Sequence, residues 1–95
     1  MKKGYWIVKG DVTDWDKFKQ YGAKTPAIIE KFCGKFLVRA GQSTLVEGSS
    51  RERNTVIEFS DYETALACWN SEEYQAVKQI RESAGELDIV VIEGA

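Results

Sequence analysis

Four short runs along the chain are rich in β-branched and aromatic residues, and two longer stretches carry apolar residues every three or four positions. Such runs predict strands, and such spacing predicts amphipathic helices. The predicted strands cover residues 5–8, 35–39, 55–59 and 88–93, with helical stretches after the first and the third. The order β-α-β-β-α-β predicts an α+β, ferredoxin-like fold, with a four-stranded antiparallel sheet and two helices on one face.

Both helical stretches contain a residue that disturbs the pattern. Gly22 and Pro26 interrupt the first, and Thr25-Pro26 predicts a restart in cap-then-first-turn order. In the second, a Ser60-x-x-Glu63 capping box opens the helix. Tyr74 then lies about 140° around the helix from Trp69. Either the helix breaks at Asn70-Ser71, or Tyr74 points away from the core.

The predicted strands carry large apolar residues on both sides, which a sheet covered on one face does not need. In the first, Trp6 and Val8 face one way and Tyr5 and Ile7 the other; the last strand repeats the pattern. Strands of this kind belong to sheets covered on both faces. One chain has helices for one face only, so we expect a homodimer packed sheet to sheet. Residues 42–47 predict a short edge strand within reach of the partner.

Composition restricts the possible chemistry. The chain has 95 residues, no histidine, and 13 Lys and Arg against 15 Asp and Glu. This length predicts one domain over residues 1–95, and the charge balance argues against nucleic-acid binding. The absence of histidine removes Ser-His-Asp catalysis and His-ligated metals. Two cysteines, Cys33 and Cys68, form no disulfide or metal pattern and predict a reducing cytoplasm. No run is long enough to span a membrane.

Several motifs resemble the domain-of-unknown-function 1330 family. They are Gly4-Tyr5-Trp6-Ile7, Gly34-x-Phe36-Leu37-x-Arg39, Val56-Ile57-Glu58-Phe59 and Trp69-Asn70-Ser71-x-x-Tyr74-Gln75. The resemblance covers nearly the whole chain. It implies membership of the dimeric α/β-barrel superfamily, whose ferredoxin-like monomers pair through their sheets around a central cleft. Relatives there include cofactor-free monooxygenases, but the family itself implies no established reaction. Gly10 stands where the family more often has an aliphatic residue.

Alternation along the strands selects the candidate ligand-binding residues. With Trp6 under the helices, Tyr5, Lys9 and Asp11 face the inter-sheet cleft. The same reasoning points Val38 inward and places Arg39 and Glu58 side by side on the cleft surface. This pair either binds a carboxylated or carbonyl ligand and tunes a general base, or forms an ion pair that fixes strand register.

Two further groups of polar residues have competing interpretations. Tyr74 is either a hydrogen-bond donor in a pocket wall or part of a helix kink in which Ser71 caps the second piece. Arg51 and Arg53 beside a Gly-Ser turn are typical of a solvated loop or a dimer-edge salt bridge.

The function that fits these observations is a small cytoplasmic homodimer whose inter-sheet cleft binds a small organic ligand without a cofactor or metal. One alternative is a cofactor-independent oxygenase or isomerase acting on a small carbonyl or carboxylate compound. Its proton transfers would fall to Glu58, Asp11, Tyr or Lys side chains with shifted pKa values. The other alternative is a purely structural or interaction dimer. Whether the protein is an enzyme is left open by the sequence.

Overall fold

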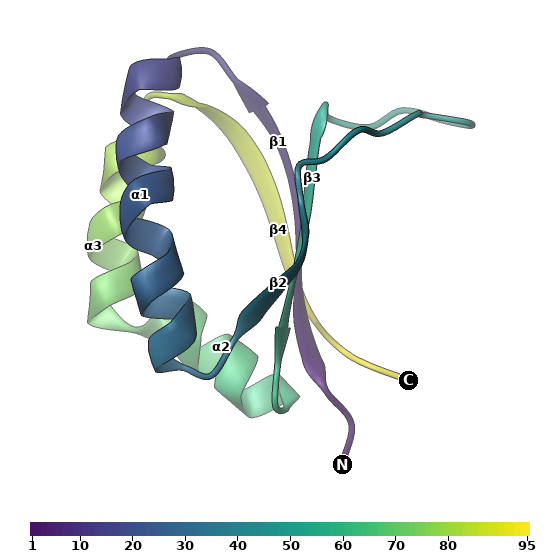
Figure 1. Cartoon of the computed structure of the whole chain (residues 1–95), viewed down its shortest axis with the longest axis vertical. Coiled ribbons are helices and arrows are strands. Elements are labelled where there is room, and N and C mark those ends of the chain that lie inside the picture. Colours follow the sequence, from purple (N-terminus) through teal and green to yellow (C-terminus); the bar gives the residue numbers. More distant parts are fainter.

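A computed structural model describes residues 1–95 and contains four strands and three helices (Figure 1). In chain order these are β1 (Gly4–Val12), α1 (Trp15–Lys31), β2 (Lys35–Arg39), β3 (Arg53–Phe59), α2 (Tyr62–Asn70), α3 (Glu72–Arg81) and β4 (Gly85–Glu93). The sheet order is β2-β3-β1-β4 and every neighbouring pair is antiparallel. This is the predicted ferredoxin-like arrangement. None of its helices combines the length and apolar composition needed to cross a bilayer.

All three helices lie on one side of the curved sheet, and the opposite side is bare (Figure 1). We call the bare side the outer face. Register fixes which residues share the helix side, because directly paired residues point the same way. Trp6 pairs with Ile57 on one neighbour and with Val91 on the other, so these three lie under the helices. The predicted inward orientation of Trp6, Val8, Ile57 and Phe59 is therefore confirmed.

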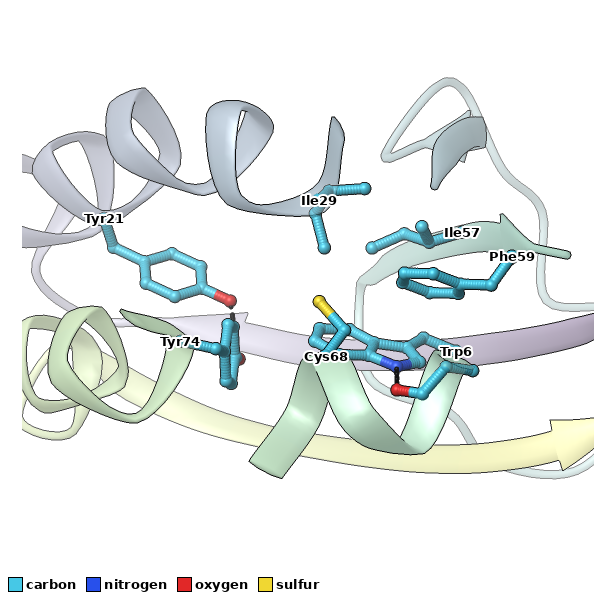
Figure 2. Close-up of a cluster of buried hydrophobic side chains, with 8 residues drawn as sticks. Trp6, Tyr21, Ile29, Ile57, Phe59, Cys68 and Tyr74 are labelled. Atoms are coloured by element: carbon cyan, nitrogen blue, oxygen red, sulfur yellow. Dashed lines mark hydrogen bonds between the residues drawn. The ribbon is translucent and has the colours of Figure 1, made fainter. Parts of the chain in front are cut away.

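Trp6 is the centre of the core. Its indole is 1% exposed and packs against Phe59, Trp69 and Tyr74, with ring centroids 5.5, 5.9 and 4.9 Å away. The indole Nε1–H donates to the Ala65 carbonyl at 2.8 Å, so its one polar group is satisfied (Figure 2). This bond ties β1 to α2, and the aromatic contacts tie it to α3.

The first helix is continuous, so the predicted restart at Thr25-Pro26 is wrong. Asp14 caps it by accepting a hydrogen bond from the Lys17 backbone N–H at 3.2 Å. Pro26 sits inside the helix, where it cannot donate to the carbonyl four residues earlier. That carbonyl belongs to Gly22.

The second helical stretch breaks at Ser71, the first of the two alternatives that the sequence left open. Ser71 ends α2, and its hydroxyl accepts from the Tyr74 N–H at 3.2 Å to begin α3. The break turns Tyr74 inward, where it is 0% exposed. The cap of α2 is Asp61, which accepts from Thr64 N–H at 2.7 Å, and not the predicted Ser60.

The second strand departs from simple alternation. Phe36 pairs with Ile57, but Val38 pairs with Val56 and Arg39 with Thr55, so the register shifts by one between Phe36 and Val38. Such a bulge moves every later side chain to the opposite face. Val38 therefore lies on the outer face and Arg39 on the helix side. Both orientations are the reverse of the prediction.

The connection between β2 and β3 forms no strand, so the predicted edge strand at residues 42–47 is wrong. The loop leaves the sheet on the outer-face side (Figure 1). Two apolar side chains in it, Leu45 and Val46, are exposed.

Candidate functional site

A pocket lies between α1 and the helix side of the sheet, near the end of β2. We call it the α1 pocket; its volume is about 70 Å³ and it is open at one side. Four of its lining residues come from α1 and the others from all four strands. They are Val8, Gly10, Phe18, Tyr21, Gly22, Thr25, Phe36, Arg39, Arg53, Thr55, Ile57 and Leu87. The walls are thus mainly aromatic and aliphatic, with hydroxyl and guanidinium groups among them.

Two glycines leave the space that the pocket occupies. Gly10 continues the inward-facing series after Trp6 and Val8, but it has no side chain to fill the row between Leu87 and Arg53. Gly22 faces the pocket from α1, and a β-carbon built there meets nothing within 4 Å. A larger residue at Gly22 would occupy this volume, whereas a β-carbon at Gly10 would meet the Leu87 side chain 3.0 Å away.

Arg39 reaches the pocket from the edge strand and is held there by the irregularity in α1. Its Nη2 donates to the Gly22 carbonyl at 3.2 Å, the acceptor left free by Pro26. Its guanidinium also lies over the Phe36 ring, 4.4 Å from the centroid. The strand bulge and the helix proline therefore act together to position one cation at the pocket.

Arg53 lies on the same face of the sheet as Arg39. Thr55 on β3 pairs with Arg39, and Arg53 is two residues away from Thr55 on the same strand. Its guanidinium stacks over two rings of α1, 5.0 Å from the Phe18 centroid and 5.4 Å from the Trp15 centroid. Partial burial, together with the positive charge of Arg39, lowers the pKa of Arg53. Neither arginine forms an ion pair with a carboxylate.

A hydroxyl pair lies behind the pocket. Tyr21, which lines the pocket, shares a 2.8 Å hydrogen bond with the buried hydroxyl of Tyr74 (Figure 2). Arg81 donates to the same Tyr74 oxygen at 3.3 Å, and its buried Nε has no acceptor. Burial, reinforced by the neighbouring Tyr21, raises the pKa of Tyr74. The Tyr74 hydroxyl is therefore protonated at physiological pH and acts as a hydrogen-bond donor and acceptor, not as a base.

Four of the residues predicted for the inter-sheet cleft do lie on the outer face, where each already has a partner in its own chain. The Tyr5 hydroxyl donates to Glu58 at 3.0 Å, and Lys35 lies 3.6 Å from the same carboxylate. Lys9 donates to Ser50 and Asn54 side chains. These contacts favour a role in strand register and loop anchoring.

Asp11, the remaining outer-face candidate, belongs to an ion cluster around Arg51. The Arg51 guanidinium lies 2.9 Å from Asp11, 2.9 Å from Asp88 and 3.1 Å from Glu86. Asp11 also accepts from the Glu52 backbone N–H at 3.0 Å, and this bond, followed by the Arg51 contact, lowers the pKa of Asp11. The cluster fastens the β2–β3 loop to β1 and β4.

The predicted proximity of Arg39 and Glu58 is wrong, because the bulge places them on opposite faces of the sheet. Tyr74 is close to the pocket through Tyr21, but it is fully buried and forms no part of the lining. Sequence reasoning did not select Tyr21, and it assigned Arg53 to a solvated loop or a dimer-edge salt bridge, whereas Arg53 lies on β3 over two aromatic rings. Arg53 continues the inward series of Thr55, Ile57 and Phe59, so extending the third strand by two residues would have found it.

No group of three or more Cys, Asp and Glu side chains is placed to hold a metal ion.

Sequence comparison places the chain in a family. The sequence model of the family described as domain of unknown function (DUF1330) matches residues 3–95. The chain belongs to the DUF1330 family. This confirms the resemblance drawn from the strand motifs. No curated protein is significantly similar in sequence to this DUF1330 member.

Solved structures share the fold at low sequence identity. A protein of unknown function from Rhodopseudomonas palustris, RPA0582, superimposes with a TM-score of 0.79 at 10% identity, over 99% of this chain and 83% of that one. SnoaB, a cofactor-independent oxygenase from Streptomyces nogalater, gives 0.64 at 12% identity, over 97% and 92%. A dimeric protein of unknown function and ferredoxin-like fold from Bacteroides fragilis gives 0.58 at 16%, over 96% and 95%. These likenesses establish that the DUF1330 chain has a ferredoxin-like fold.

Proposed function

We propose that this protein is a homodimer that binds a small organic ligand in the α1 pocket of each subunit. The observation that carries the proposal is the pocket itself, an open, mostly apolar space on which a few polar groups converge. Tyr21 and Thr25 offer hydroxyl groups from α1, and Arg39 and Arg53 offer cations from the sheet. The inter-sheet location expected from the sequence has less support, because its carboxylates, Glu58 and Asp11, already have cationic partners, whereas Arg39 and Arg53 have no carboxylate.

The outer face supports the dimer. An apolar band crosses it, formed by residues of all four strands: Tyr5, Ile7, Val38, Val56, Val90 and Ile92. On the edge strand β4, Val90 is 53% exposed and Ile92 is 48% exposed, and large apolar side chains that gather on one exposed face mark an interaction surface. A second copy of the same face would cover this band, and the Bacteroides fragilis neighbour is described as dimeric. The β2–β3 loop projects on this side, over a hollow of about 530 Å³ that a partner could fill.

A cofactor-independent oxygenase is the second candidate, and its support is the likeness to SnoaB. The pocket chemistry weighs against it. The lining residues include no Asp, Glu, Lys or Cys, so nothing there can act as a general base near neutral pH. The raised pKa of Tyr74 keeps the buried hydroxyl behind the pocket protonated. We therefore favour binding over proton-abstraction chemistry.

A purely structural dimer is the third possibility, and the two faces of the sheet separate it from ligand binding. The apolar band is on the outer face, and the α1 pocket is on the helix side. Dimerisation would therefore leave the pocket unfilled. A cytoplasmic location completes the proposal, supported by two cysteines that are both free.

The binding proposal is tested by filling the pocket from α1. Gly22→Leu places a side chain in space that is empty in the wild type. Ala23→Leu adds the same bulk at the adjacent, exposed position and is the matched control. Mass spectrometry of small molecules released from purified wild-type protein should show a compound that is depleted in the Gly22→Leu sample and retained in the Ala23→Leu sample. Equal retention by all three proteins would place the ligand elsewhere.

The dimer is tested by light scattering at micromolar concentration. We expect twice the 10.7 kDa chain mass for the wild type. Val90→Lys should shift the population towards monomer, because it buries a charge in the apolar band. Ala76→Lys adds the same charge on the exposed surface of α3 and should leave the dimer intact. A wild-type mass of one chain would contradict the dimer.

A further inference from the structure

The α1 pocket holds two arginines and no negative charge. Arg39 and Arg53 occupy neighbouring positions on one face of β2 and β3, so their guanidinium groups repel each other. Arg53 is partly buried, which deprives its charge of some solvation. A cation in this situation ordinarily has a carboxylate beside it. Here the partners are ring faces of Phe18, Trp15 and Phe36, together with the Gly22 carbonyl.

Elsewhere in the chain, two half-buried cations have carboxylate partners, whereas Lys9 is held by the Ser50 and Asn54 side chains and the buried Arg81 by the Tyr74 hydroxyl. Arg51, whose side chain is 28% exposed, contacts three carboxylates. Lys78, at 30%, lies near Glu82. The chain has 15 acidic residues to draw on, yet none reaches the arginines of the α1 pocket. The pocket is therefore a site of uncompensated positive charge within a protein whose net charge is −2.

The rest of the lining indicates what kind of anion would fit. Val8, Ile57 and Leu87 form an aliphatic floor, and Phe18 and Phe36 form aromatic walls. The volume of about 70 Å³ is small and the pocket is open at one side, so a short, flat apolar group can enter it with part of the group left outside. A carboxylate has two oxygens in one plane, and it can accept from both guanidinium groups at once. The pocket contains no glycine-rich loop of backbone N–H groups, the usual cradle for phosphate.

We propose that the α1 pocket binds a small monocarboxylate with a short, flat apolar body, whose carboxylate lies between Arg39 and Arg53. This assignment rests on the proposed binding function and adds the chemical class of the ligand. The apolar body lies against the aliphatic floor between the sheet and α1. The bound carboxylate offsets the repulsion between the two arginines. The negative charge of the ligand therefore contributes to affinity as well as to specificity.

The test compares benzoate with benzamide, which has the same shape and no charge, by ligand-observed NMR titration at fixed ionic strength. We expect benzoate to bind at least about tenfold more tightly than benzamide, because benzamide lacks the carboxylate that forms charge-assisted hydrogen bonds with the arginines. Arg53→Gln and Arg39→Gln should each weaken benzoate by about tenfold or more and leave benzamide unchanged. Lys19→Gln removes one positive charge from an exposed position of α1 and should leave both affinities unchanged.

The outcomes separate this inference from the function on which it rests. Equal binding of benzoate and benzamide, with both lost in Gly22→Leu, would retain a ligand pocket and overturn the carboxylate assignment. Tighter binding of inorganic phosphate than of benzoate to the wild-type protein would also overturn the carboxylate assignment, in favour of a phosphate site. If Lys19→Gln lost as much benzoate affinity as the two arginine variants, the preference for benzoate would reflect general charge attraction and the assignment would fail. Binding of neither probe would count against both proposals.

Discussion

Removal of the Tyr74 hydroxyl tests how the buried part of the site is held together. Tyr74→Phe keeps the ring that packs against Trp6 and deletes an oxygen with two partners. Tyr21 loses its 2.8 Å hydrogen bond, and Arg81 loses the acceptor 3.3 Å from its Nη2. Because Arg81 is only 7% exposed and its Nε already has no acceptor, the variant leaves a buried cation with still fewer hydrogen bonds.

The magnitude follows from counting these partners. A net hydrogen bond contributes about 1 kcal/mol, and an unsatisfied buried donor costs about 1–3 kcal/mol. We expect Tyr74→Phe to lower the free energy of unfolding by about 2–4 kcal/mol. Tyr21→Phe removes only the shared bond and leaves Tyr74 with Arg81, so we expect a loss of about 1 kcal/mol.

Urea denaturation followed by tryptophan fluorescence measures both variants, since Trp6 is buried in the core beside Tyr74. Protein concentration is held fixed because the unfolding of a dimer depends on it. The double variant completes a thermodynamic cycle that isolates the coupling between the two hydroxyls. The reasoning is refuted if Tyr21→Phe is as destabilising as Tyr74→Phe, or if neither exceeds about 0.5 kcal/mol.

Three further predictions concern stability. Gly22→Ala should raise the free energy of unfolding by about 1 kcal/mol in thermal or urea unfolding, because alanine favours helix and its β-carbon meets nothing within 4 Å; a loss would contradict the open space at this position. Gly4→Ala should lower it by about 1–3 kcal/mol, since the new β-carbon would lie 2.2 Å from the Asp61 carbonyl oxygen, and a neutral result would show that α2 can shift. Burial raises the pKa of Cys68 from 9.0 to about 12, so the neutral thiol stabilises the fold fully below pH 9 and this contribution declines as pH rises above it. In Cys68→Ala the free energy of unfolding should therefore fall less steeply between about pH 9 and 10 than in the wild type. The decline at higher pH that is due to Tyr74 should remain. An unchanged slope of unfolding free energy against pH would contradict this.

Much of the fold was predictable because it depends on alternation and turn chemistry. Trp6, Ile57 and Phe59 lie on the inward face that the period-two pattern assigned to them. The break at Ser71 was one of two stated possibilities, and the angular position of Tyr74 was the signal that raised it. The family followed from motifs in the strands and in the second helical stretch.

The site was less predictable because it depends on two local irregularities. A bulge at Leu37 reverses the orientation of Arg39, and one extra residue in an edge strand leaves no mark in the pattern of apolar positions. The sequence predicts an interruption at Pro26, but the helix continues through it and supplies the free Gly22 carbonyl as an acceptor for Arg39. Both features involve contacts between elements far apart in the sequence.

The most direct test of the account is the location of a bound carboxylate, mapped by amide chemical shifts in the wild-type protein during a benzoate titration. The account predicts that the shifted amides cluster around the α1 pocket, at Gly10, Gly22 and Arg53, and that Ile7 and Val90 on the outer face stay in place. Shifts confined to the outer face would return the site to the interface between the sheets. No shift at the pocket residues would contradict the proposed function itself.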